Sequence, residues 1–142
     1  MSNDNVKVVQ EGYAAFGRGD IQFVLDTMTS DVTMGIIGRQ EDLELFGIRA
    51  GKAGAQEFFR LLDETHQIHT FVPDRFLGAE DKVFVWGHYS WTMRRSGVSK
   101  ENSWLHELTI RDGKICAWHG HNDTAMLVAA YYGRPIKQTM NG

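Results

Sequence analysis

The fold is decided by the stretch Lys82–Asn122, which reads KVFVWGHYSWTMRRSGVSKENSWLHELTIRDGKICAWHGHN. Apolar and polar residues alternate along most of it, and turn-forming pairs interrupt the alternation at Ser96-Gly97 and Asp112-Gly113. Alternation with a period of two is typical of strands that bury one face, and Asp-Gly between such runs is a strong hairpin signal. We therefore predict three long strands in succession, over residues 82–94, 102–111 and 114–122.

Before this stretch the apolar period is helical. A stripe with the spacing i, i+3, i+7 and i+10 is formed by Val6, Val9, Tyr13 and Phe16. Asp20 follows a glycine-containing break and is typical of the N-cap of a second helix. The remaining predicted elements are helices over 21–28, 52–66 and 124–132, strands over 32–37 and 69–77, and a polar loop over 38–50. Pro73 predicts an edge position or a bulge for its strand.

The order of these elements indicates an α+β fold, since helices come first, a meander of antiparallel strands follows, and one helix ends the chain. We predict a cone-shaped, curved antiparallel sheet wrapped around the N-terminal helices. Such a sheet encloses a pocket, which is the default ligand site. The sequence has no repeat and no linker-like stretch, so residues 1–142 form one predicted domain, with an ordered core over about 4–133 and a tail over 134–142.

Composition excludes several classes of protein. The 142 residues are 42% hydrophobic and 23% charged, as in globular domains, and no stretch approaches the roughly 18 apolar residues of a membrane span. The start, Met1–Asn5, predicts no signal peptide. A net charge of −3 and a single adjacent basic pair, Arg94-Arg95, argue against a nucleic-acid partner. The lone cysteine, Cys116, excludes an internal disulfide and suits a cytoplasmic protein.

The turn near Asp112-Gly113 decides which side chains face the pocket. A two-residue loop would place His106 opposite His119, whereas a three-residue loop starting at Arg111 would place it opposite Trp118. Apolar segregation favours the three-residue loop. It gathers on one face Trp104, His106, Leu108, Ile110, Cys116, Trp118 and Gly120. We predict that this face forms the pocket wall.

Three segments of the chain resemble a known family. They read YAAFGRGDI at 13–21, GKAGAQEFF at 51–59, and RDGKI at 111–115 leading to NDTA at 122–125. In this order they resemble the SnoaL-like and ketosteroid-isomerase-like branch of the nuclear-transport-factor-2-like superfamily. The resemblance implies a cone-shaped domain, a deep and largely apolar cavity, and homodimers that pair through the outer face of the sheet.

The resemblance also locates the catalytic positions of three related branches. In the polyketide-cyclase branch the histidine falls on His106 and the aspartate on Gly120. In the ketosteroid-isomerase branch the general base falls on Ile36 and the oxyanion-hole aspartic acid on His106. In the limonene-epoxide-hydrolase branch the arginine and first aspartate fall on Gly87 and Tyr89, and the second aspartate on Gly120. None of these sets is intact in this chain.

His106 is the first candidate for a catalytic residue, because an imidazole in an apolar pocket can act as an acid or base. Tyr89 or Tyr13 could orient it. The alternative is a partly buried histidine bonded to the backbone or to a tyrosine hydroxyl, and Tyr89 could equally be a core aromatic. The indoles of the pocket face could stack on a flat ligand. The predicted substrate contacts are Tyr13, Trp91, Trp104, Trp118 and Gly120.

Other polar residues have plainer explanations. His119 and His121 form an H-x-H pair that could bind a metal with Asp123 or His88, but surface or interface histidines are the preferred interpretation. We predict neither a metal nor a cofactor, and we interpret Asp123 as an N-cap. Loop 38–50 could close over the cavity and supply a carboxylate from Glu41, Asp42 or Glu44.

Two functions are compatible with these features. The first is an enzyme of the isomerase or lyase type that acts on a small apolar cyclic substrate, such as a polyketide, steroid-like ketone or terpenoid. It would catalyse a cofactor-free isomerisation, cyclisation or dehydration with His106 as acid or base; epoxide hydrolysis is less favoured. The second is a non-catalytic dimeric module that binds a small apolar ligand, which the missing carboxylate pair favours.

Overall fold

The elements of the chain follow the predicted order, in a computed structural model that describes residues 2–134. The helices are α1 (Ser2–Gly17), α2 (Ile21–Asp26), α3 (Gly51–Thr65) and α4 (Thr124–Tyr132). The strands are β1 (Met28–Ile36), β2 (Gly47–Ala50), β3 (His66–Ala79), β4 (Lys82–Met93), β5 (Ser99–Arg111) and β6 (Lys114–His121). The predicted α+β class is confirmed, while the predicted tail beyond residue 134 lies outside the described residues. No helix within 2–134 is both long and apolar enough to cross a bilayer.

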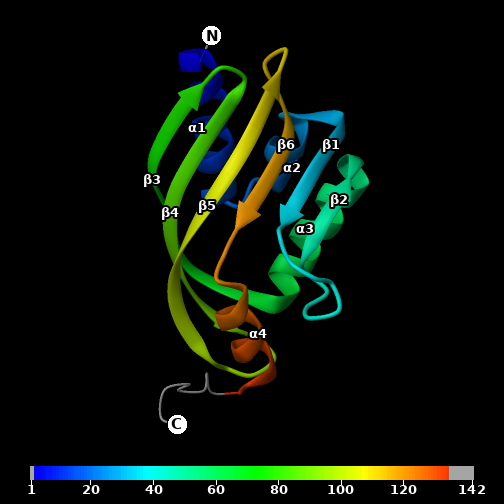
Figure 1. Cartoon of the computed structure of the whole chain (residues 1–142), viewed down its shortest axis with the longest axis vertical. Coiled ribbons are helices and arrows are strands. Elements are labelled where there is room, and N and C mark those ends of the chain that lie inside the picture. The colour runs from blue at the N-terminus through cyan, green and yellow to red at the C-terminus, as the bar shows by residue number, and fades with distance from the viewer. Residues whose placement is uncertain (1, 135–142) are drawn as a thin grey trace.

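The strands form one curled, unclosed sheet in the order β2-β1-β6-β5-β4-β3. The long strands β3, β4 and β5 bend around the helices α1 and α3, as Figure 1 shows. Neighbouring strands are antiparallel except β1 and β6, which run parallel. The predicted antiparallel meander of long strands is confirmed in β3–β6. The parallel pairing of β1 with β6 was not predicted, because alternation reveals a strand but not the direction of its partner.

Four strands differ from their predicted limits by more than one residue, and one of them, β5, begins at Ser99 instead of residue 102. The segment predicted as loop 38–50 ends in the short strand β2, whose Arg49 pairs with Met34 of β1. Met28 begins β1 instead of ending the second helix, and it is fully buried. The strand predicted over 69–77 extends over the whole of β3. Pro73 behaves as predicted, since β3 is an edge strand and its register shifts between Pro73 and Arg75.

The β5–β6 hairpin turns through two residues. Asp112 and Gly113 have positive φ angles of 52° and 76°, and Arg111 pairs with Lys114 across the turn. Positive φ at both central residues is the hallmark of the tight turn that joins twisted strands, and Gly adopts it without strain. The predicted three-residue loop is therefore wrong.

A bulge next to this turn restores the predicted face. Cys116 has no partner on β5, and beyond it His106 pairs with Gly120, where Trp118 was predicted. The error is two residues, an even number, so His106, Trp118 and Gly120 still lie on one face of the sheet. Close to the turn the bulge brings Ile115 inward, fully buried, in place of the predicted Cys116.

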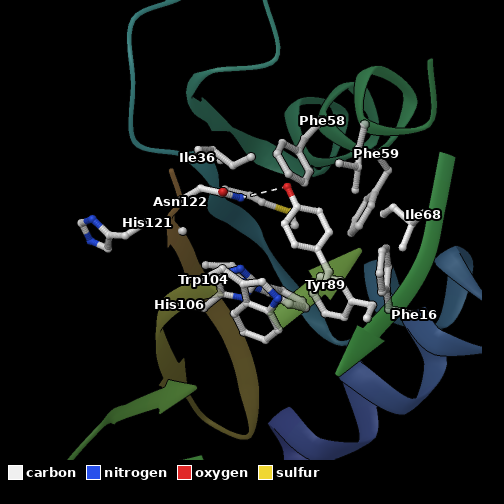
Figure 2. Close-up of a pocket in the computed structure, with 16 residues that line it drawn as sticks. Phe16, Ile36, Phe58, Phe59, Ile68, Tyr89, Trp104, His106, His121 and Asn122 are labelled. Atoms are coloured by element: carbon white, nitrogen blue, oxygen red, sulfur yellow. Dashed lines mark hydrogen bonds between the residues drawn. The ribbon is translucent and has the colours of Figure 1, made fainter. Parts of the chain in front are cut away.

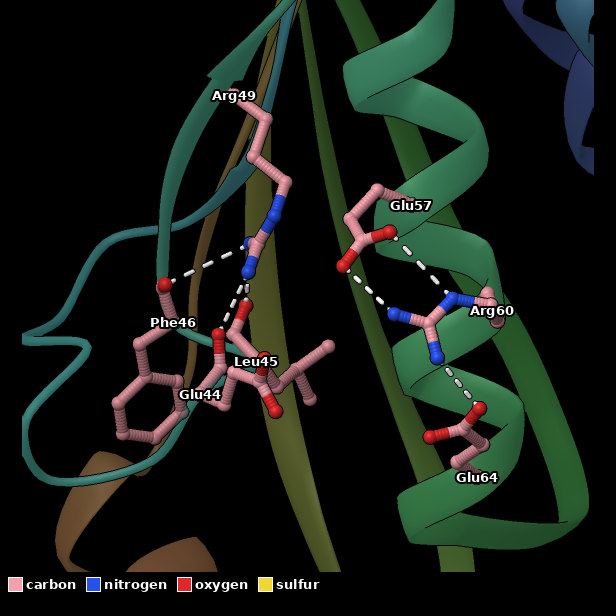
Figure 3. Close-up of polar contacts among 7 residues, drawn as sticks. All are labelled: Glu44, Leu45, Phe46, Arg49, Glu57, Arg60 and Glu64. Atoms are coloured by element: carbon pink, nitrogen blue, oxygen red, sulfur yellow. Dashed lines mark hydrogen bonds and ion pairs between the residues drawn. The ribbon is translucent and has the colours of Figure 1, made fainter.

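Arg49 holds the loop that precedes β2. Its guanidinium donates to the carbonyl oxygens of Glu44 at 2.6 Å and Leu45 at 2.9 Å, and it reaches the carbonyl of Phe46 at 3.5 Å (Figure 3). Leu45 and Phe46 are buried in the core. The loop is thus a packed part of the domain, fastened by one cation to several carbonyl groups.

Candidate functional site

A cavity lies between the inner face of the sheet and the helices α1 and α3 (Figure 2). The volume of the cavity is about 60 Å³. The described residues that line it include no Asp and no Glu. Its aromatic wall consists of Phe16, Phe58, Phe59, Phe71, Tyr89, Trp104 and Trp118. The aromatic wall suits a flat, mostly apolar ligand.

His106 contributes an imidazole to the cavity wall from the middle of β5. The ring stacks on the indole of Trp104, with centroids 4.1 Å apart and planes inclined by 21°. Across the strand pair, Gly120 leaves the space that the ring occupies, because a Cβ at this position would lie 3.1 Å from Cδ2 and 3.4 Å from Nε2 of His106. A larger residue at 120 would press on the imidazole.

The hydrogen bonds of His106 determine its tautomer. Nδ1 receives the indole N–H of Trp118 at 3.1 Å and contacts the hydroxyl of Tyr13 at 2.5 Å. An indole N–H can only donate, so Nδ1 is an acceptor and the hydrogen of the neutral ring is on Nε2. No residue among 2–134 forms a hydrogen bond to Nε2. The Nε2–H group is therefore the donor that His106 has available for the cavity.

Burial keeps this cluster uncharged. Loss of solvent and, to a smaller extent, the nearby charge of His121 together lower the pKa of His106 to about 3. Burial raises the pKa of the Tyr13 hydroxyl well above its usual value, which the hydrogen bond from Trp118 only partly offsets. At neutral pH the site thus presents a neutral imidazole that donates a hydrogen bond, instead of an imidazole that titrates.

Tyr89 faces a different set of partners. Its hydroxyl accepts from Asn122 Nδ2 at 3.2 Å and contacts His66 Nε2 at 3.4 Å; the bond to Asn122 is the dashed line in Figure 2. Burial raises the pKa of Tyr89 and lowers that of His66 to about 4. Of the two tyrosines predicted as possible partners of His106, the structure brings Tyr13 to the imidazole.

The predicted substrate contacts separate into two groups. Trp104, Trp118 and Gly120 line the cavity together with His106 and Tyr89. Tyr13 and Trp91 are buried, at 4% and 0% exposure, and do not belong to the lining. The hydroxyl of Tyr13 forms a hydrogen bond with Nδ1 of His106, and the Nε1–H of Trp91 donates to Asn102 at 2.9 Å.

Comparison with known proteins identifies the family. The profile of the SnoaL-like domain matches residues 9–118. The chain belongs to the SnoaL-like domain family. No protein of curated function has a sequence that matches significantly.

Several solved structures share the nuclear-transport-factor-2-like fold of this SnoaL-like protein. A protein of unknown function from Burkholderia pseudomallei is 25% identical, with a TM-score of 0.83, over 92% of this chain and 98% of that one. One from Burkholderia thailandensis is 27% identical, with a TM-score of 0.80, over 92% and 98%. TerC, co-crystallised with polyporic acid, is 26% identical, with a TM-score of 0.81, over 91% and 98%.

Asn122 and His121 are the polar lining residues of the SnoaL-like cavity that were not among the predicted contacts. The available signal for Asn122 was its parity, because Asn122 follows Trp118 and Gly120 at alternate positions and therefore shares their face. The sequence gives no such signal for the lining phenylalanines of α1, α3 and β3. Which of them line the cavity depends on how the helices pack against the sheet.

Residues on the outer face and in the loop do not join the cavity. His119 bonds Thr33 at 2.9 Å on the outer face, and no group of three or more potential metal ligands occurs within residues 2–134. His121 lies at the cavity rim with its ring directed away from it (Figure 2). The carboxylates of loop 38–50 are absent from the lining; Asp42 instead pairs with Arg39 at 2.8 Å.

Proposed function

We propose that this SnoaL-like protein binds a small apolar ring compound that carries a carbonyl oxygen, and that the Nε2–H of His106 donates to this oxygen. One observation carries the proposal. Two neighbours, Tyr13 and Trp118, occupy Nδ1 of the imidazole, so the ring has a fixed orientation and one free polar group, which is a donor. A carbonyl oxygen is the acceptor that such a donor needs, and the aromatic wall suits a flat ring.

The same arrangement supports a class of reaction. A hydrogen bond from a fixed donor in a water-poor site stabilises negative charge that develops on a carbonyl oxygen. This is the charge that forms when a proton leaves the adjacent carbon in an isomerisation, cyclisation or dehydration. We propose such a cofactor-free reaction, of the isomerase or lyase type, with His106 as the group that polarises the carbonyl. That TerC was crystallised with polyporic acid supports a small-molecule ligand in this fold.

A second function is favoured by a specific observation. The described lining has no carboxylate, and the pKa of His106 is lowered to about 3, so the cavity has no obvious group to remove a proton. A non-catalytic protein that binds the same ring compound needs no such group. The two functions share the ligand and differ in turnover.

Binding and turnover of cyclohex-2-enone and related ketones, epoxides and lactones test both functions. We expect His106→Ala to weaken enone binding roughly tenfold, the effect of one hydrogen bond in a buried site. His119→Ala is the matched control, because this histidine lies on the opposite face of the sheet. Equal affinity in wild type and His106→Ala would overturn the proposal. Turnover lost in His106→Ala supports the enzyme; binding without turnover of any tested compound supports the binding module.

We also propose a cytoplasmic homodimer. Three apolar side chains are exposed on the outer face of β3 and β4, Val72, Leu77 and Trp86, at 39%, 44% and 40% exposure. Large exposed apolar areas often mark interfaces. Sedimentation of the wild type as a dimer and of Trp86→Glu as a monomer is the expected result, and a monomeric wild type would refute it.

A further inference from the structure

A chain of directed hydrogen bonds leads from the core to the cavity wall. It begins at Trp91, whose Nε1–H donates to Oδ1 of Asn102 at 2.9 Å. The amide nitrogen of Asn102 donates to the carbonyl of Ser103 at 2.9 Å and to Oδ1 of Asn122 at 2.7 Å. Both ends of the Asn102 amide are therefore in use. Turning it over would set a donor against the indole N–H and an acceptor against the Ser103 carbonyl.

The orientation of the Asn122 amide follows from this arrangement. Its Oδ1 accepts from Asn102 and also from the backbone N–H of Asp123 at 2.7 Å. Its nitrogen gives one hydrogen to the hydroxyl of Tyr89 at 3.2 Å. The second hydrogen of Nδ2 has no hydrogen-bond partner among residues 2–134. Because Asn122 lines the cavity, it offers a donor there and not an acceptor.

The chain continues away from the cavity and ends on the backbone. Since Asn122 donates to Tyr89, the tyrosine hydroxyl is free to donate to His66 Nε2, at 3.4 Å. His66 then carries its hydrogen on Nδ1 and donates to Thr65 Oγ1 at 2.8 Å, and Thr65 donates to the carbonyl of Leu61 at 2.8 Å. Every step from Trp91 to Leu61 has the same donor-to-acceptor sense, which resists reversal of any one member.

We infer that Asn122 is a second ligand-contact residue, that Asn102 is its positioning residue, and that the ligand carries a second acceptor oxygen. This inference rests on the proposed function, in which His106 takes the first oxygen. His106 lies on β5 and pairs with Gly120 of the neighbouring strand β6, and Asn122 directly follows β6 and lines the same cavity. The ligand class is thus a cyclic compound with two carbonyl-type oxygens.

An independent observation also points to an acceptor on the ligand. The indole N–H of Trp104 is buried, at 3% exposure of the residue, and has no hydrogen-bond partner among residues 2–134. A buried donor without a partner is costly in a native structure. Trp104 lines the same cavity as His106 and Asn122, whose free groups are donors as well. Together they form a site rich in donors, and the described lining offers no carboxylate to compete for them.

Matched ring ketones test the inference. Cyclohexanone offers one acceptor oxygen, whereas cyclohexane-1,2-dione and cyclohexane-1,4-dione offer two at different spacings. We expect the wild type to bind the better-fitting dione roughly three- to tenfold more tightly than cyclohexanone, the effect of one additional hydrogen bond. In ¹⁵N-labelled protein, the side-chain amide signals of Asn122 should shift with this dione and stay in place with cyclohexanone.

Variants separate contact from positioning. Asn122→Ala and Asn122→Asp should lose the preference for the dione over cyclohexanone. Asn102→Asp, which retains the acceptor for Trp91 but has no N–H to donate, should lose the preference although the residue does not line the cavity. Ser103→Ala is its matched control, because it leaves the Ser103 carbonyl in place, and it should behave as the wild type. Thermal unfolding verifies that each variant is folded.

The outcomes distinguish this inference from the proposed function. If the wild type binds cyclohexanone through His106 and the Asn122 variants keep the preference for the dione, the inference is wrong and the proposed function stands. A folded Asn102→Asp variant with an unchanged preference would remove the positioning role. If His106→Ala binds both rings as well as the wild type, the proposed function fails, and the inference that rests on it fails too.

Discussion

The indole nitrogen of Trp118 lies 3.1 Å from Nδ1 of His106 and donates a hydrogen bond to it. This one contact decides what the imidazole can do, because an acceptor at Nδ1 places the hydrogen on Nε2. Tyr13 reinforces the arrangement from α1 through its hydroxyl. The cavity therefore meets a donor that packing has oriented in advance.

Trp118→Phe tests this arrangement. The variant keeps an aromatic side chain but removes the N–H donor to Nδ1. This hydrogen bond stabilises only the neutral imidazole, because a protonated Nδ1 cannot accept it. We expect the pKa of His106 to rise from its value of about 3, and the affinity for a ring ketone to fall severalfold. A pH titration of the histidine resonances by NMR measures the first effect. Trp86→Phe, at an exposed indole, is the control and should change neither.

The buried histidines predict how stability depends on pH. His106 has a pKa of about 3 in the fold and an ordinary value of 6.5, and His66 has a pKa of about 4. Between these values the unfolded chain binds a proton that the native state does not, so the free energy of unfolding falls as the pH falls below about 6.5. The slope is about 1.4 kcal/mol per pH unit for each histidine.

Urea unfolding at pH 7, 5 and 4 measures this dependence. His106→Gln should have a shallower loss of stability between pH 6.5 and 4 than the wild type, because one titrating group is gone. His69→Gln, at an exposed histidine, should follow the wild-type slope. Parallel slopes in all three proteins would contradict a neutral, buried His106.

Substitution by alanine should affect the free energy of unfolding differently at Arg49 and at Arg60. Arg49→Ala leaves the carbonyl groups of Glu44 and Leu45 without their donor and should cost about 2 kcal/mol of unfolding free energy. Arg60 forms exposed ion pairs with Glu57 and Glu64 on α3 (Figure 3). Such pairs contribute little, so Arg60→Ala should unfold close to the wild type. Equal losses in the two variants, measured in urea, would argue against the structural role of Arg49.

Gly87 lies against the indole of Trp104, which stacks on His106, so a larger residue at position 87 should disturb this pair. A Cβ at position 87 would lie 2.2 Å from Cζ2 of Trp104, so Gly87→Ala should displace the indole from His106 and cost about 3 kcal/mol or more. Gly12→Ala is the contrast: its Cβ would sit 3.8 Å from Ile115, and alanine favours the helix by up to about 1 kcal/mol. Thermal unfolding should thus lower one midpoint and raise the other. A Gly87→Ala variant as stable as the wild type would show that the indole can move freely.

The fold was predictable wherever alternation extended over many residues. The long strands β4 and β5 show this period clearly, and Asp20 and Asp123 cap their helices as predicted, by accepting from Phe23 N and Met126 N. β2 was missed because four residues, Gly47–Ala50, are too few to show a period. The parallel pairing of β1 with β6 joins segments that are distant in sequence, and no local pattern encodes it.

The sequence predicted which face of the sheet lines the cavity, but it did not predict the hydrogen-bond partners of His106. Parity placed His106 with Trp118 and Gly120 despite the wrong loop length, because the turn and the bulge at Cys116 shift the register by an even number of residues. The bulge itself has no local signature. The contact of Tyr13 with His106 spans 93 residues and depends on how α1 packs against the sheet, which periodicity does not determine.

The tautomer of His106 is the most direct test of the central claim. In ¹⁵N-labelled protein, the imidazole nitrogens of His106 should show a hydrogen on Nε2 and an unprotonated Nδ1 at every pH from 7 to 5. The Nε2–H signal should shift when cyclohex-2-enone is added. A hydrogen on Nδ1, an imidazolium at pH 6, or an Nε2–H signal that the ketone leaves unchanged would contradict a neutral donor that holds a carbonyl oxygen.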